Sequence, residues 1–68
     1  MSEEAKKLGK NLKSIRTKKG ISQGDIVKIL DMPKSFVSSI ENGKTNPTLS
    51  TIAKIAKAIG VSVGELMK

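Results

Sequence analysis

Hydrophobic residues recur at three- and four-residue spacing along most of the chain, which is the period of an α-helix. Ala5, Leu8, Leu12 and Ile15 follow this spacing near the N-terminus, and Gly9 weakens the helix that they predict. No segment alternates apolar and polar residues as a half-buried strand would. The pattern predicts an all-α fold, a compact bundle of five helices at about residues 3–19, 23–30, 34–42, 49–59 and 63–67.

Capping residues and glycines mark where these helices begin and end. The expected N-caps are Ser2, Ser22, Thr48 and Ser62, and the expected stops are Gly20, Gly43 and Gly60. Asp25 and Glu65 each follow a capping serine by three residues, which is the spacing of a capping box. The sequence therefore predicts short helices with well-defined ends.

Two short helices between Gln23 and about Asn42, joined by a three-residue break, have the proportions of a helix-turn-helix. The side chains expected to pack them together are Ile26, Val27, Leu30, Met32, Val37 and Ile40. Asp31, at the break, must bear any left-handed conformation at some cost. Pro33 suits a first helical turn, so the second helix begins at Lys34 or, with Ser35 as its cap, slightly later.

The fourth helix carries its own apolar stripe, which is expected to complete the core. Its members are Leu49, Ile52, Ala53, Ala56 and Ile59. Val61, Val63, Leu66 and Met67 make the last segment apolar as well.

The chain has 68 residues, enough for one small domain, and we expect residues 1–68 to form it. Thirteen basic residues against six acidic ones give a net charge of +7. Such an excess favours a polyanionic partner, nucleic acid first and an anionic membrane surface second. No cofactor or metal is expected, because the chain lacks the histidines and cysteines that usually bind zinc.

Several classes of protein fit the sequence poorly. Its carboxylates are scattered and it has no glycine-rich phosphate loop, so we expect no enzyme. No apolar run approaches the roughly 20 residues of a membrane span, and the N-terminus has no apolar core as a signal peptide would. The absence of cysteine agrees with a cytoplasmic protein.

Three stretches together resemble the DNA-binding domain of lambdoid phage repressors and Cro proteins. They are LKSIRTKKGISQ at 12–23, SSIENGKTNPT at 38–48 and IAKAIGVSVGELM at 55–67. The chain is similar to stand-alone members, namely prophage repressors and restriction–modification controller proteins. The resemblance implies a transcriptional regulator, a repressor, that binds double-stranded DNA at an inverted repeat as a homodimer, with helix 34–42 in the major groove.

Roles for individual residues follow from the resemblance and from the faces of helix 34–42. At about 100° per residue, Ser35, Ser39 and Asn42 point away from Val37 and Ile40. The candidate base contacts are Lys34, Ser35, Ser38 and Ser39, and the candidate phosphate contacts are Ser22, Gln23, Asn42 and Lys44. The alternatives are a phosphate contact for Lys34, a plain N-cap for Ser22, and ordinary helix-surface or loop positions for the others.

Arg16 and Phe36 could each have either a structural role or a contact with DNA. The resemblance pairs Arg16 with Glu41 in a partly buried ion pair, and the planar guanidinium of arginine suits a carboxylate partner. The competing role for Arg16 is a phosphate contact. Phe36 either touches a thymine methyl group or, as we prefer, packs against the second helix.

A dimer contact would have to come from the domain itself. The candidates are Val63, Leu66 and Met67, with the end of the fourth helix and the Asn46–Pro47 loop nearby. The alternative is that these residues only close a small core.

Other functions stay open at this point. An antitoxin-type protein would bind both DNA and a partner protein. The segment TIAKIAKAIG resembles basic amphipathic helices that lie on membranes. RNA readers usually stack bases on aromatic side chains, and Phe36 is the single aromatic residue of the chain.

Overall fold

The computed structural model describes residues 2–68, and within them all regular structure is helical. The helices are α1 (Glu3–Lys18), α2 (Gln23–Leu30), α3 (Lys34–Glu41), α4 (Leu49–Ile59) and α5 (Val63–Met67). The all-α prediction is confirmed, and three of the five helices have the predicted bounds. α1 and α3 each end one residue earlier than predicted.

The predicted capping residues begin four of the helices. The Ser2 and Thr48 side chains accept hydrogen bonds from the backbone N–H groups of Ala5 and Thr51. Ser22 and Ser62 form complete capping boxes with Asp25 and Glu65. The three predicted stops, Gly20, Gly43 and Gly60, have φ values of 71°, 70° and 74°, a left-handed conformation that glycine adopts without steric cost.

The break between α2 and α3 uses a strained residue and a proline. Asp31 has φ 53° and ψ 49°, which is the left-handed conformation that the sequence analysis considered. Pro33 is the N-cap of α3 and makes no side-chain capping bond, and the helix begins at Lys34. Ser35 is therefore inside the first turn of α3 and does not cap it.

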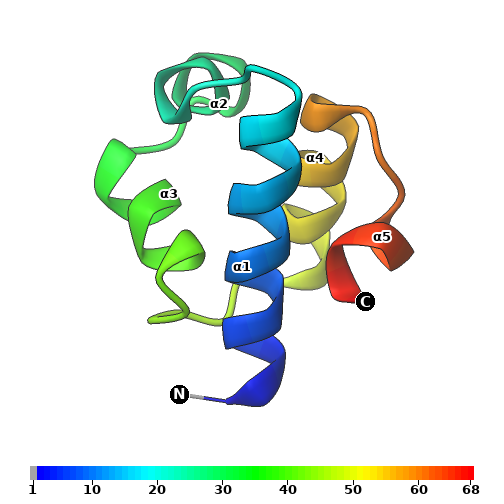
Figure 1. Cartoon of the computed structure of the whole chain (residues 1–68). Helices are drawn as coiled ribbons and strands as arrows, with labels where there is room; N and C mark the ends of the chain where they lie inside the picture. Colours follow the sequence, from blue (N-terminus) through cyan, green and yellow to red (C-terminus); the bar gives the residue numbers. More distant parts are fainter. Residues whose placement is uncertain (1) are drawn as a thin grey trace.

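The five helices share one core. Figure 1 shows α1 in the centre of the molecule, with α3 on one side of it, α5 on the other and α4 behind. The fully buried side chains with the largest volumes are Leu8, Leu12, Ile26, Ile40, Ile55, Ile59, Leu66 and Val37. The Asn11 side chain ties α1 to α5 by donating a hydrogen bond of 2.7 Å to the Leu66 carbonyl oxygen.

The predicted apolar stripe of α4 is wrong at three positions. Leu49 is 71% exposed and Ala53 is also exposed, whereas Ile55, which the stripe omitted, is buried. α4 packs against α2 and α5, and Ile55 belongs to the core that the helices share. Leu49 stands at the first position of the helix, where no other element covers it.

Leu66 is corrected from the dimer candidates to the core. Its side chain has no exposed surface, because α1 and α4 enclose α5 from the side that Leu66 occupies. Val63 and Met67 are only half-buried against the same core. Of the three candidates, these two retain surface that a second protein molecule could cover.

Gly9 permits a close approach that its local sequence does not reveal. A Cβ atom at Gly9 would lie 2.3 Å from the Ile40 carbonyl oxygen and 2.6 Å from that of Glu41. The residue that weakens α1 locally thus lets α1 lie directly against the last turn of α3. None of the helices in residues 2–68 is long and apolar enough to cross a membrane.

Candidate nucleic-acid interface

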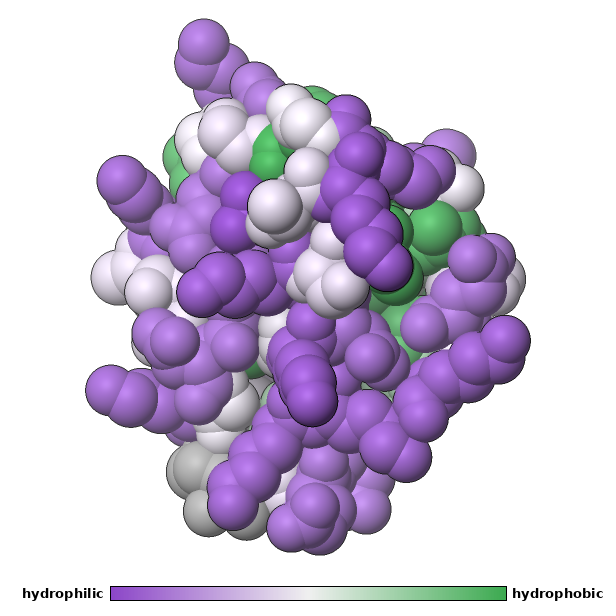
Figure 2. Space-filling view, viewed as in Figure 1, coloured by the Kyte–Doolittle hydropathy of each residue, from purple (hydrophilic) through white to green (hydrophobic). Residues whose placement is uncertain are grey.

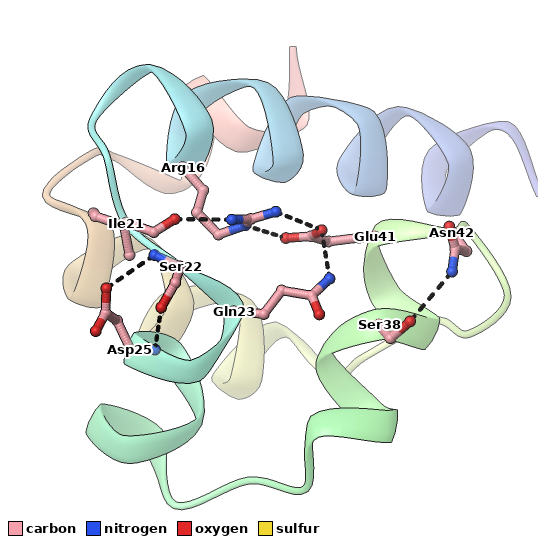
Figure 3. A network of polar contacts seen from close by, with 8 residues as sticks. All are labelled: Arg16, Ile21, Ser22, Gln23, Asp25, Ser38, Glu41 and Asn42. Atoms are coloured by element: carbon pink, nitrogen blue, oxygen red, sulfur yellow. Dashed lines mark hydrogen bonds and ion pairs between the residues drawn. The ribbon is translucent and has the colours of Figure 1, made fainter.

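A buried ion pair connects α1 to α3, as Figure 3 shows. Arg16 Nε donates to Glu41 Oε2 at 2.6 Å and Arg16 Nη2 donates to Glu41 Oε1 at 3.1 Å, so the pairing is bidentate. The side chains are 12% and 3% exposed. The third guanidinium nitrogen, Nη1, donates to the Ile21 carbonyl oxygen at 2.8 Å and so fixes the loop before α2. Arg16 therefore makes the ion pair with Glu41 that the resemblance implied.

Gln23 brings α2 into the same network, a contact that the sequence analysis missed. Its Nε2 donates to Glu41 Oε1 at 2.9 Å, so this oxygen accepts hydrogen bonds from α1 and α2 at once (Figure 3). Gln23 is the first residue of α2, and Glu41 is the last residue of α3. No spacing rule relates positions so far apart in the chain, so only packing brings them together.

The candidate base-contact residues of α3 lie on its outer side. Lys34 and Ser35 are exposed, and Ser38 and Ser39 are half-buried. The opposite side of the helix buries Val37, which is 1% exposed. Apart from Lys34, the candidate residues of the outer face have short polar side chains, so the helix backbone can come close to a binding partner.

Two other residues of this region have partners in the structure. Asn42 Nδ2 donates to the Ser38 hydroxyl at 3.3 Å, which orients the exposed Asn42 amide along α3. Phe36 is half-buried and packs against the core. This is the packing role that the sequence analysis preferred for it.

The candidate phosphate contacts form two groups, one at the start of α2 and one just after α3. Ser22 and Gln23 lie where α2 begins, and Asn42 and Lys44 lie just after α3. Ser22 is exposed, and its hydroxyl caps α2 by accepting from the Asp25 N–H at 3.0 Å. Asn42 and Lys44 are exposed. Because Gln23 contacts Glu41 and Asn42 directly follows it, both groups of candidate phosphate contacts lie near the C-terminal end of α3.

The start of α2 also holds an acidic side chain. The Ser22 backbone N–H donates to Asp25 Oδ2 at 2.9 Å, and this hydrogen bond holds the pKa of the Asp25 carboxyl below its ordinary value. The Ser22 hydroxyl and Lys28 act in the same direction. Asp25 is thus an ionised part of the capping box. Residues 2–68 contain no cluster of histidine, cysteine, aspartate and glutamate side chains that could hold a metal ion.

Comparison with protein families matches residues 12–66 to a family described as helix-turn-helix. The matched segment contains α2, α3 and α4, the C-terminal part of α1 and most of α5. The chain belongs to this helix-turn-helix family. Its relatives are named as transcriptional regulators and controller proteins, in agreement with the expectation that the chain is not an enzyme.

Individual relatives resemble this helix-turn-helix protein in sequence, and one of known structure also resembles it in fold. The transcriptional regulator PuuR of Escherichia coli K12 is 37% identical over 65 residues, which are 96% of this chain and 35% of PuuR. The chain thus spans about a third of that relative. The structure of the restriction–modification controller protein C.AhdI from Aeromonas hydrophila is 32% identical, with a TM-score of 0.87 over 96% of this chain and 98% of C.AhdI.

A second controller protein was solved together with DNA. C.Esp1396I, a tetramer in complex with its natural 35-base-pair operator, matches over the full length of both chains with a TM-score of 0.83 and 26% identity. Control proteins and phage phi105 proteins also occur among the relatives. The resemblance to phage repressors and controller proteins is therefore confirmed.

Proposed function

We propose that this helix-turn-helix protein is a transcriptional regulator, a repressor, that binds double-stranded DNA sequence-specifically with α3 in the major groove. The observation that carries the proposal is the outward face of α3, which is polar and has both groups of candidate phosphate contacts near its C-terminal end. A major groove admits one α-helix and presents a distinct donor and acceptor pattern for each base pair. Short hydroxyl side chains such as Ser35 and Ser39 can reach those base edges.

The buried network supports the same proposal through geometry. Base readout requires that the recognition helix keep a fixed orientation relative to the residues that hold the phosphates. Glu41 joins the end of α3 to Arg16 on α1 and to Gln23 at the start of α2. The network therefore holds the recognition helix and one group of phosphate contacts in a single rigid unit.

We further propose that the protein acts as a homodimer on an inverted repeat. One short helix reads only a few base pairs, and two-fold symmetry doubles that readout with half-sites about one helical turn apart. C.Esp1396I, which resembles this chain, binds its operator as a tetramer. Val63 and Met67 are candidates for the dimer contact, and the exposed side chain of Leu49 is a third.

Residues 1–68 would be one DNA-binding domain in this proposal. The relatives come from bacteria and their phages, so the regulator would act in the cytoplasm, where bacterial DNA lies. Repression would follow when the bound protein blocks access of the transcription machinery to its operator.

Selection from a random double-stranded DNA pool at physiological salt tests the proposal. We expect an enriched inverted repeat whose half-site centres lie about 10 base pairs apart. Recovery of bound duplexes without any consensus, with binding lost steeply as salt rises, would show phosphate-driven binding only and would overturn sequence-specific regulation.

A further inference from the structure

We propose that Lys6 and Lys13 of α1 bind the phosphate backbone of the operator duplex, beside the groove that α3 enters. The inference rests on the proposed function and extends it to α1, where the sequence analysis considered a phosphate contact for Arg16 alone. It assigns α1 a second role in addition to its place in the core.

The close approach of α1 to the end of α3 carries the inference. The Ile40 and Glu41 carbonyl groups leave no room for a side chain at Gly9. A Cβ atom at Gly43 would lie 3.1 Å from the Lys6 Cα atom, so the loop after α3 touches α1 one turn before Gly9. The N-cap of α1 makes another contact with this loop, because the Ser2 hydroxyl donates to Asn46 Oδ1 at 3.3 Å.

The spacing along α1 then places the two lysines. Residues three, four and seven apart lie on one side of a helix, so Lys6, Gly9 and Lys13 share the side of α1 that faces the end of α3. Lys6 and Lys13 are separated by seven residues, about 10 Å along the helix axis. Lys6 adjoins Gly43, whose chain neighbours Asn42 and Lys44 are candidate phosphate contacts. The lysines therefore extend that group along α1.

The charge of these side chains is not neutralised within the protein. Lys6 and Lys13 are exposed, and the salt bridge of residues 2–68 joins Arg16 to Glu41 instead. α1 has no acidic residue after Glu4. Figure 2, in the orientation of Figure 1, shows hydrophilic side chains over most of the face on which α1 lies in front. An uncompensated row of positive charge that continues a DNA-binding surface fits the regularly spaced phosphates of the same duplex.

A purely structural role for the same lysines makes a different prediction. Cations stabilise a helix C-terminus through its dipole, and Lys6 lies beside the end of α3. Loss of that interaction would lower the free energy of unfolding and leave the salt dependence of DNA binding unchanged. Loss of phosphate contacts would instead lower the salt dependence of DNA binding and leave the free energy of unfolding unchanged.

The test compares two double variants with equal loss of charge. Lys6→Gln/Lys13→Gln removes the proposed contacts, and Lys54→Gln/Lys57→Gln removes two exposed lysines from α4, which packs against α2 and α5. The dissociation constant of each protein for the selected operator is measured between about 50 and 200 mM salt. Thermal unfolding of each protein is measured alongside.

We expect the slope of log affinity against log salt to fall by about 1.8 for the α1 variant and to change little for the α4 variant. As salt rises over this range, the affinity of the wild-type protein would then fall about 12 times further than the affinity of the α1 variant. Equal changes in both variants, or an unchanged slope with a lower melting temperature in the α1 variant, would overturn the inference. Failure of the proposed function is a separate result, because the wild-type protein would then select no consensus sequence. In that case the salt slopes of the variants are compared on a random duplex.

Discussion

Gly9 lies so close to the carbonyl group of Ile40 that no side chain fits between α1 and α3. A Cβ atom there would be 2.3 Å from the carbonyl oxygen, and the obstacle is backbone, which cannot rotate out of the way as a side chain can. The last turn of α3, with Glu41 in it, thus takes its position from direct contact with α1. The geometry of the DNA-facing surface depends on this contact.

We expect Gly9→Ala to destabilise the protein by about 1–3 kcal/mol, because α1 and α3 must separate to make room for a methyl group. Alanine usually favours a helix by roughly 1 kcal/mol relative to glycine. This gain offsets only part of the cost of separating the two helices. Chemical denaturation measures the difference. Gly64→Ala is the control, because its Cβ would lie 3.7 Å from the nearest atom, the Ser62 hydroxyl oxygen. Equal stability of the two variants would show that α1 does not constrain α3.

Glu41→Ala should cost about 3–5 kcal/mol of stability, because it leaves the charge of Arg16 largely buried and unpaired. Thermal unfolding measures this loss, and a wild-type melting temperature would refute the structural role of the pair. The double variant Arg16→Met/Glu41→Leu removes both charges together. We expect it to be more stable than Glu41→Ala, since apolar residues of similar volume leave no isolated charge in the core.

Gln23→Leu should cost about 1.5–3 kcal/mol of stability, the usual worth of a hydrogen bond to a charged group. It should also weaken operator binding beyond the loss of folded protein, because α2 is no longer tied to Glu41 in α3. Denaturation and DNA titration on the same samples separate these effects. If the folded variant binds the operator with wild-type affinity, the role of Gln23 is confined to the stability of the protein.

The stability of the protein should depend on Asp25 in acid. Its folded-state pKa lies below the ordinary value of about 3.9, so the unfolded chain takes up the proton first as the pH falls. The stability that Asp25 contributes is present above that value and is lost as the pH falls through the lowered pKa. The difference in free energy of unfolding between wild type and Asp25→Asn should be constant above about pH 5 and shrink below about pH 4. A difference that is independent of pH would contradict this.

Lys34 and Lys44 should affect DNA binding in different ways, although each substitution removes one charge. Lys34→Ala should cost about 1–3 kcal/mol and relax the preference at one base pair of each half-site. Lys44→Ala should weaken binding to all sequences alike and lower the salt slope by about 1. Ser35→Ala and Ser39→Ala should each alter the preference at a single position. Titration of the selected operator and its single-base variants measures all four, and identical profiles for the two lysine variants would refute the assignment.

Helix boundaries could be predicted almost completely from the sequence. A capping serine or threonine, a capping box and a terminal glycine each act within three or four residues, so the local sequence contains the whole interaction. Ser22, Asp25 and Gly43 therefore behave as their neighbours predict. The inward direction of Val37 and Ile40 also followed from helical periodicity alone.

Contacts between helices were decided by the tertiary structure. Leu49 and Ile55 are both apolar residues of α4, yet Ile55 is buried and Leu49 is not, because the position of neighbouring helices decides which flank is covered. Gly9 looks unfavourable within α1 and becomes necessary only where α3 crosses it. Gln23 and Glu41 meet across 18 positions of sequence. The sequence by itself thus determined the helices and their inward faces through short-range interactions, and only the folded chain could decide how those helices approach one another.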